Sequence, residues 1–120
     1  MTTISPAGRP LDVVCLCAAW CINCNAYQPV FDALQAQFEG RARFSWVDIE
    51  DESEVMGEVE VENFPTLFLV QDSTALFLGP LTPQPGVLAQ LVQSALDQRL
   101  SPLREAAAQA LAQRVVQHLG

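Results

Sequence analysis

Four cysteines lie within ten consecutive positions of this chain, at Cys15, Cys17, Cys21 and Cys24. Disulfides stabilise a small fold by closing long loops between distant segments, whereas these cysteines can close only short ones. The cluster is therefore interpreted as a reactive site. The most informative part of the cluster is the Cys-x-x-Cys pair formed by Cys21 and Cys24, because thiols at this spacing can cycle between dithiol and disulfide. The alternative interpretation of that pair is two buried structural cysteines.

The elements that position the pair follow from hydrophobic patterning. Residues 11–18 form a nearly continuous apolar run, which is typical of a strand buried on both faces. Residues 21–38 repeat apolar side chains at helical spacing, and we expect this helix to be kinked or restarted at Pro29. Cys21 then lies at a strand-to-helix junction, where free N–H groups and the helix dipole favour a thiolate. Cys24 follows one helical turn later and deeper in the structure.

The remaining elements complete an α/β fold. The expected elements are a second strand at 42–49, a short helix around Val55 and Met56, hairpin strands at 66–71 and 75–78, a helix from Pro83 or Pro85 to Leu96, and a last helix that begins at Ser101-Pro102. Burial of the apolar strands requires a central mixed sheet of about four strands flanked by helices. We expect one domain over residues 1–120, with a core at 11–98 and an additional C-terminal helix at 101–119.

Composition and charge exclude several classes of function. A chain of 120 residues that is 50% hydrophobic and 17% charged should fold as one ordered domain. Its net charge of -8 argues against nucleic acid or an anionic membrane surface as a partner. No apolar run is long enough to span a membrane, and the N-terminus lacks the basic start of a secretory signal, so we expect a cytoplasmic protein. The acidic stretch from Asp48 to Glu62 is interpreted as a solvated face, with steering of a basic partner as the alternative.

The sequence resembles the thioredoxin family over roughly residues 11–98. The residues that carry the resemblance are Val14 to Cys24 (VCLCAAWCINC), Pro29, Val47-Asp48 and Phe64-Pro65-Thr66. The resemblance implies a thioredoxin-like fold and thiol-disulfide oxidoreductase activity, in which Cys21 attacks a substrate disulfide and Cys24 resolves the mixed disulfide. It also implies disulfide-containing protein substrates, a reductase or thiol as electron donor, and no cofactor.

The resemblance further implies how a substrate is bound. Pro65 would follow a cis peptide bond and lie against the cysteine pair, where a residue without an N–H cannot compete for a thiolate. The backbone of Phe64 would pair with an extended substrate segment, and Trp20 would shape the same surface. The alternative for Pro65 is an ordinary proline at the start of a strand.

The sequence departs from the family pattern in three ways. Ile22-Asn23 replaces the usual Gly-Pro between the two cysteines, and no basic residue is nearby in the sequence, so we expect a moderate thiolate fraction and a reducing pair. The family's buried aspartate falls on Cys15, and the lysine that accompanies it falls on Trp46. A thiol is a poorer base than a carboxylate at neutral pH, so the resolving step should be slow. We also expect that apolar groups replace the buried ion pair as a unit.

Several alternatives stay open on the sequence alone. Cys15 and Cys17 share one face of their strand, either as small buried hydrophobic residues or with Cys15 as an auxiliary redox thiol near Cys24. A metal site formed by either of them with Cys21 and Cys24 is disfavoured, because structural zinc usually takes separated ligand pairs, and we expect no metal. The last helix either packs on the domain or forms a homodimer. The rival function is a non-enzymatic binding or assembly protein with a vestigial or regulatory cysteine pair.

Overall fold

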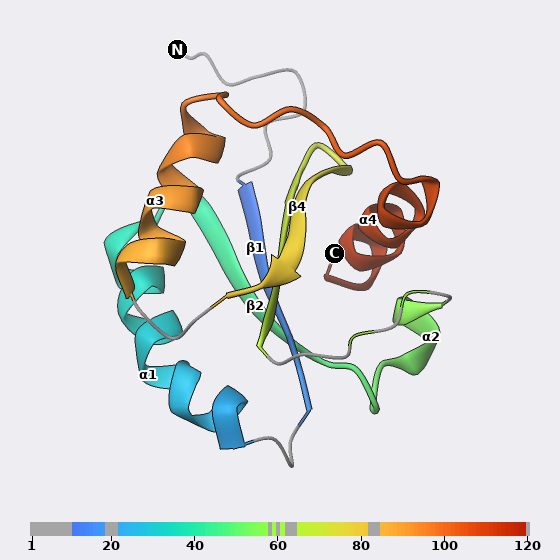
Figure 1. Cartoon of the computed structure of the whole chain (residues 1–120), viewed down its shortest axis with the longest axis horizontal. Coiled ribbons are helices and arrows are strands. Elements are labelled where there is room, and N and C mark those ends of the chain that lie inside the picture. Colours follow the sequence, from blue (N-terminus) through green and yellow to red (C-terminus); the bar gives the residue numbers. More distant parts are fainter. Residues whose placement is uncertain are drawn as a thin grey trace.

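The computed structural model describes residues 11–18, 22–57, 59, 61, 65–81 and 85–119. In chain order they form β1 (Leu11–Cys17), α1 (Ile22–Gln37), β2 (Ala42–Asp48), α2 (Ser53–Met56), β3 (Thr66–Gln71), β4 (Thr74–Pro80), α3 (Pro85–Leu96) and α4 (Ala106–Leu119). The strands form one sheet in the order β2-β1-β3-β4, in which β1 runs parallel to β2 and antiparallel to β3. Figure 1 shows α1 and α3 on one face and α2 and α4 on the other. The predicted fold class is confirmed.

Strand β1 lies in the centre of the sheet, and all seven of its residues are buried. Helices cover both faces, which explains why the strand is nearly continuously apolar. Asp12 is the exception to this pattern. Its Oδ1 accepts a hydrogen bond from Arg43 Nε on the neighbouring strand β2 at 2.6 Å, so the buried carboxylate has a charged partner.

The face of the sheet under α1 and α3 carries the cysteines. Cys15 and Cys17 of β1 pack in one apolar cluster with Cys24 and Tyr27 of α1 and with Leu88 of α3. The prediction that the two strand cysteines share a face is therefore correct. The carboxyl end of β1 and the first turn of α1 meet here, so the fold brings together cysteines from two successive elements.

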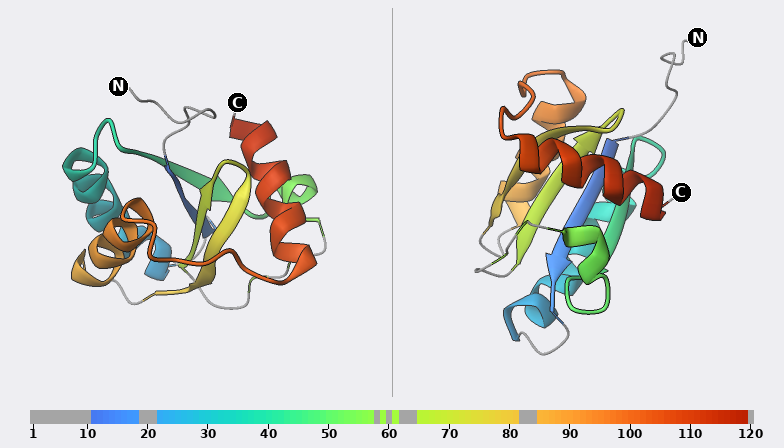
Figure 2. Two further views of the ribbon diagram at one scale, coloured as in Figure 1. Left: turned by 90° about the horizontal axis from the view of Figure 1, so that it is seen from above. Right: turned by 90° about the vertical axis from the view of Figure 1, so that its right-hand side faces the viewer.

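The opposite face is covered mainly by α4, because α2 has only four residues. The buried side chains of α4 are Ala108, Leu111, Ala112, Val115 and Val116. They pack in one cluster with Val14, Leu16, Phe68 and Val70 of the sheet, and the crossing of α4 over this face is visible in Figure 2. The apolar stripe of the last helix thus packs on its own domain, which is the first of the two roles that the sequence left open.

Helix α4 also fixes the short helix α2. Arg114 donates hydrogen bonds from Nε to the Val55 carbonyl at 2.6 Å and from Nη2 to the Met56 carbonyl at 3.0 Å. These carbonyls belong to the C-terminal end of α2, where intrahelical donors run out. Gly57 follows at a φ of 58°, a left-handed conformation that glycine adopts without strain.

The predicted start of the last helix at Ser101-Pro102 is wrong, because α4 begins at Ala106. Tertiary contacts hold the preceding segment against the hairpin instead. The Leu103 N–H bonds to the Ala75 carbonyl at 2.9 Å, and the Gln109 side-chain amide donates to the Leu103 carbonyl at 2.8 Å. Gln109 also exchanges two hydrogen bonds with the Ala75 backbone. These bonds outweigh the local helix-start signal.

Other elements follow the expectation with small differences. Helix α1 continues through Pro29 and does not restart there. The hairpin turn consists of Asp72 and Ser73, both with positive φ, so Thr74 begins β4 and is not part of the turn. Met56 is buried in α2, as expected for a short helix between the second strand and the hairpin. No helix in the described part of the chain is long and apolar enough to cross a membrane.

Candidate functional site

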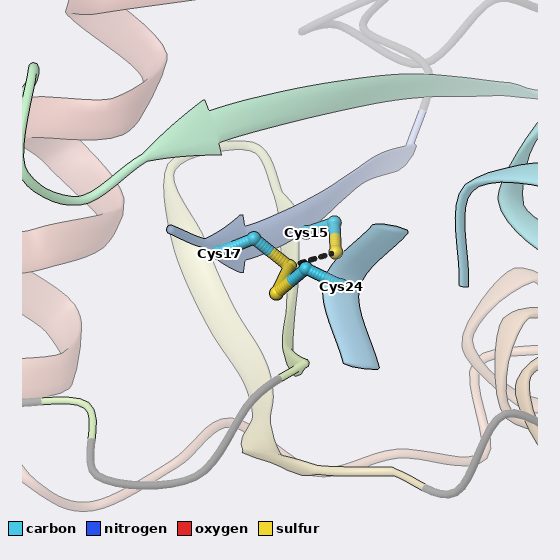
Figure 3. Close-up of a disulfide and its surroundings, with 3 residues drawn as sticks. All are labelled: Cys15, Cys17 and Cys24. Atoms are coloured by element: carbon cyan, nitrogen blue, oxygen red, sulfur yellow. Dashed lines mark hydrogen bonds between the residues drawn. A yellow bond between two sulfur atoms is a disulfide. The ribbon is translucent and has the colours of Figure 1, made fainter. Parts of the chain in front are cut away.

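Three cysteine sulfurs meet between the end of β1 and the first turn of α1, and we call Cys15, Cys17 and Cys24 the sulfur cluster (Figure 3). Cys17 and Cys24 are joined by a disulfide, with their Cα atoms 5.9 Å apart, well within the usual range for bridged residues. The Cys15 Sγ lies 3.1 Å from the Cys17 Sγ. Cys15 donates this contact, because Cys17 has no proton in the disulfide. All three residues have an exposed fraction of 0%.

The backbone of Cys17 is held by pairing with β2, and its side chain is joined to α1 by the disulfide. Cys17 is the last residue of β1 and is paired in register with Asp48 of β2. Its carbonyl accepts a hydrogen bond from the Ile49 N–H at 2.9 Å, just beyond the end of β2. The site is therefore built on rigid elements.

Burial raises the pKa of the Cys15 thiol to about 12. Desolvation disfavours the thiolate, and no charged partner in the described part of the chain compensates for it. Cys15 therefore stays protonated at neutral pH, so it cannot serve as a general base and is suited to donating a hydrogen bond.

Tyr27 is the second polar group beside the sulfur cluster. It lies one turn after Cys24 on the same side of α1 and is fully buried. Its hydroxyl has no hydrogen-bond partner among the described residues. Burial raises the pKa of this hydroxyl, and the Cys15 thiol raises it further at the high pH at which that thiol ionises, so the tyrosine is neutral at neutral pH.

Trp46 occupies the position of the family's lysine. Its side chain was expected to be buried, but the structure exposes it. It is the register partner of Cys15, but its exposed fraction is 37% because β2 is an edge strand. Its ring packs edge-on against Phe31 with the centroids 5.8 Å apart. The replacement of a buried pair by apolar groups therefore holds for Cys15 and only in part for Trp46.

The sequence-predicted site residues divide into two groups. Cys15, Cys24 and Pro65 are described, and all three are buried. Trp20, Cys21 and Phe64 lie outside the described residues. The cis peptide bond before Pro65 joins it to one of these residues and stays a prediction.

Sequence reasoning missed two features of the site. Cys17 was assigned no redox role, although its position at the end of β1 and on the face of α1 was a signal that it could meet Cys24. Ile22, between the two cysteines of the motif, has an exposed fraction of 82%. This side chain lies in the first turn of α1, two residues before Cys24.

The surrounding charge is acidic where the structure describes it. Glu50, Asp51 and Glu54 are exposed, while Asp48 is partly buried and its Oδ1 accepts hydrogen bonds from the Glu50 and Asp51 N–H groups. This exposure fits the interpretation of a solvated face. Within the described ranges, no group of three His, Cys, Asp or Glu side chains is arranged to hold a metal ion.

Comparisons with known proteins agree with the fold. The family model described as Thioredoxin matches residues 7–80. Over 55 residues, or 46% of this chain, the sequence is 33% identical to Thioredoxin of Staphylococcus aureus and to Protein disulfide isomerase-like 1-3 of Arabidopsis thaliana. The match spans about half (53%) of the bacterial protein and 10% of the plant protein.

Two solved structures have the same fold. The germline-specific thioredoxin Deadhead of Drosophila melanogaster superposes with a TM-score of 0.66 at 18% identity, over 73% of this chain and 83% of that one. Mitochondrial thioredoxin 3 of Saccharomyces cerevisiae, in its oxidised form, gives 0.63 at 23% identity, over 72% and 79%. Identities this low establish similarity of fold alone.

Proposed function

Because the chain belongs to the thioredoxin family, we propose that it is a thiol-disulfide oxidoreductase acting on protein disulfides, with Cys21 as nucleophile and Cys24 as resolving cysteine. The observation that carries this proposal is the state of Cys24. Its sulfur, in the first turn of α1, forms a disulfide with Cys17. A vestigial cysteine needs no partner within bonding distance, whereas a resolving cysteine must alternate between partners.

The role of Cys21 rests on its place in the sequence. It directly precedes Ile22, the first residue of the 16-residue helix α1. The positive end of a helix dipole stabilises a thiolate. The Cys21 thiolate attacks one sulfur of the substrate disulfide and releases the other as a thiolate. Cys24 then attacks Cys21, which forms the Cys21–Cys24 disulfide and releases the second substrate thiol.

The substrate surface proposed here combines apolar groups around the pair. Ile22 is exposed at the start of α1, and Trp20 and Phe64 are its proposed neighbours in contacting an extended segment. Pro65 has no N–H and cannot compete with the substrate for the thiolate. The electrons come from a reductase or another thiol donor, and the proposed location is the cytoplasm.

The resolving step is proposed to be slow. Cys15 occupies the family's carboxylate position but has a pKa raised to about 12, so it takes no proton from Cys24 at neutral pH. Mixed disulfides through Cys21 should therefore persist longer than in a relative that keeps the carboxylate.

A disulfide-reduction assay tests the proposal. With dithiothreitol as donor and a protein disulfide as substrate, Cys21→Ser should reduce turnover to the uncatalysed background. Ala26→Ser is the matched control, because it places a serine at an exposed position of the same helix, where turnover should stay at the wild-type level.

The rival function makes the opposite prediction in the same assay. If the wild-type chain is folded but no faster than Cys21→Ser, the oxidoreductase proposal is wrong. The chain would then be a thioredoxin-like binding or assembly protein.

A further inference from the structure

The sulfur cluster holds more thiols than a Cys-x-x-Cys cycle needs. That cycle uses Cys21 and Cys24, yet Cys24 is bonded to Cys17, and Cys15 touches Cys17 from the other side. The disulfide links the last residue of β1 to the first turn of α1 and is fully buried. Because both cysteines have an exposed fraction of 0%, external thiols have no direct access to this disulfide in the folded chain.

We propose that Cys17 and Cys24 form a second, buried redox couple, into which Cys21 passes the disulfide that it takes from a substrate. This inference rests on the proposed function, because it requires that Cys21 and Cys24 first exchange with a substrate. Cys17 is the further catalytic residue that it assigns.

The transfer step balances without any additional reactant. Starting from the Cys21–Cys24 disulfide, the Cys17 thiolate attacks the Cys24 Sγ. The Cys17–Cys24 bond forms, the Cys21–Cys24 bond breaks, and Cys21 leaves as a thiolate. Over the whole sequence the substrate disulfide gains two electrons and two protons, which come from the thiols of Cys17 and Cys24, while Cys21 ends as it began.

The return path reverses this exchange. The Cys21 thiolate attacks the Cys24 Sγ and releases Cys17, and an external dithiol then reduces the Cys21–Cys24 disulfide. Both directions depend on a good leaving group. Cys21 leaves easily because a helix N-terminus stabilises its thiolate, and a thiol of lower pKa leaves faster.

When the Cys17–Cys24 bond breaks, Cys17 is released as a thiolate inside the core, where an unpaired charge is costly. The protonated Cys15 thiol lies 3.1 Å from its sulfur and donates a hydrogen bond to it. Cys15 is therefore a positioning residue for the departure of Cys17.

Disulfide mapping tests the second couple directly. A protease that cleaves after aromatic residues cuts after Trp20 and Tyr27, so Cys15 and Cys17 fall in peptide 1–20, while Cys21 and Cys24 fall in peptide 21–27. The reduced full-length chain is oxidised with glutathione disulfide, alkylated, denatured and digested without reduction. We expect peptides 1–20 and 21–27 to be linked, with Cys21 alkylated. A disulfide confined to peptide 21–27, with intact turnover, would overturn the second couple and leave the proposed function standing.

Two variants sharpen the assignment. In Cys17→Ala the disulfide should move inside peptide 21–27, and Cys21 should lose its alkylation. Cys15→Ala, at the matched position two residues earlier on the same face, should keep the two peptides linked. If Cys15→Ala breaks this link while Cys17→Ala keeps it, Cys15 rather than Cys17 is the partner of Cys24 and the assignment is wrong.

The rate at which dithiothreitol reduces the Cys17–Cys24 disulfide distinguishes a positioning role of Cys15 from a role in packing alone. If Cys15 supplies the donor to Cys17, Cys15→Ala should open the Cys17–Cys24 disulfide more slowly than wild type, whereas a merely loosened core would open faster. Equal or faster opening refutes the role of Cys15. If no disulfide forms in any variant and turnover is absent, the proposed function itself fails.

Discussion

Replacing Cys15 by aspartate probes the least usual feature of the site, a thiol where the family resemblance places a carboxylate. The new side chain would sit where Cys15 now contacts the Cys17 Sγ at 3.1 Å, next to the sulfur bonded to Cys24. A carboxylate there can accept the proton of an attacking thiol. Positioned bases typically contribute about 10²–10⁴-fold, so resolution of a mixed disulfide should speed up by a measurable part of that range.

The same substitution should cost stability. Cys15 has an exposed fraction of 0%, and Trp46, its register partner, offers no positive charge. If burial raises the pKa of the carboxyl group from about 3.9 to roughly 7, the shift of about 3 units corresponds to a loss of about 4 kcal/mol at high pH. That loss is a large part of a typical free energy of unfolding, which is roughly 5–15 kcal/mol.

The sign of the pH dependence follows from the raised pKa. The folded protein binds the proton more tightly than the unfolded chain, so the penalty is absent below the unfolded pKa. It grows as the pH rises and is complete above the folded pKa. The melting temperature of Cys15→Asp should therefore fall further below that of wild type at pH 8 than at pH 4.

The assay pairs rapid-quench measurement of mixed-disulfide resolution with thermal melting at both pH values. Cys15→Asn is the matched control, because it has a similar shape and polarity but neither base nor charge. Equal resolution rates for the two folded variants would refute the claim that a missing base limits the reaction. An equal loss of stability at pH 4 and pH 8 would contradict the buried placement of Cys15.

Three further predictions concern the fold that holds the site. Leu111→Ala should lower the free energy of unfolding by about 2–5 kcal/mol in denaturant titration, since it opens a cavity under α4. Gln113→Ala, on the exposed side of the helix, should change it little, and equal effects of the two substitutions would contradict the packing of α4. Gly57→Ala should lower the melting temperature, because φ is 58° there and a Cβ would lie 2.7 Å from Arg114 Nη2. An unchanged melting temperature would refute that contact. Tyr27→Phe should stabilise the oxidised protein by about 1 kcal/mol, because it removes a buried hydroxyl without a partner; a clear loss of stability would show that the hydroxyl is bonded.

Local patterns in the sequence were sufficient for most of the fold. The apolar run at residues 11–18 and the helical spacing after it depend only on which side chains must be buried, so β1 and α1 were found nearly to their ends. The start of α4 was missed because a backbone hydrogen bond from Leu103 to Ala75, far away in the sequence, competes with the local cap at Ser101. No local rule contains that contact.

The candidate site could be predicted only in part. The motif identified Cys24, and strand alternation placed Cys15 and Cys17 on one face. The choice of Cys17 as the partner of Cys24 depends on how α1 crosses the end of β1, which is a three-dimensional fact. Similarly, the exposure of Trp46 follows from β2 being an edge strand, and the order of strands in the sheet is not written in any one segment.

Trapping of a mixed disulfide is the most direct test of the claim that this chain exchanges disulfides through Cys21. Cys24→Ser removes the resolving thiol and leaves the nucleophile. After incubation with a protein disulfide, the account predicts a covalent adduct at Cys21 in the intact mass, which dithiothreitol releases. An adduct at the buried Cys15 or Cys17, or no adduct from a folded Cys24→Ser chain, would contradict it.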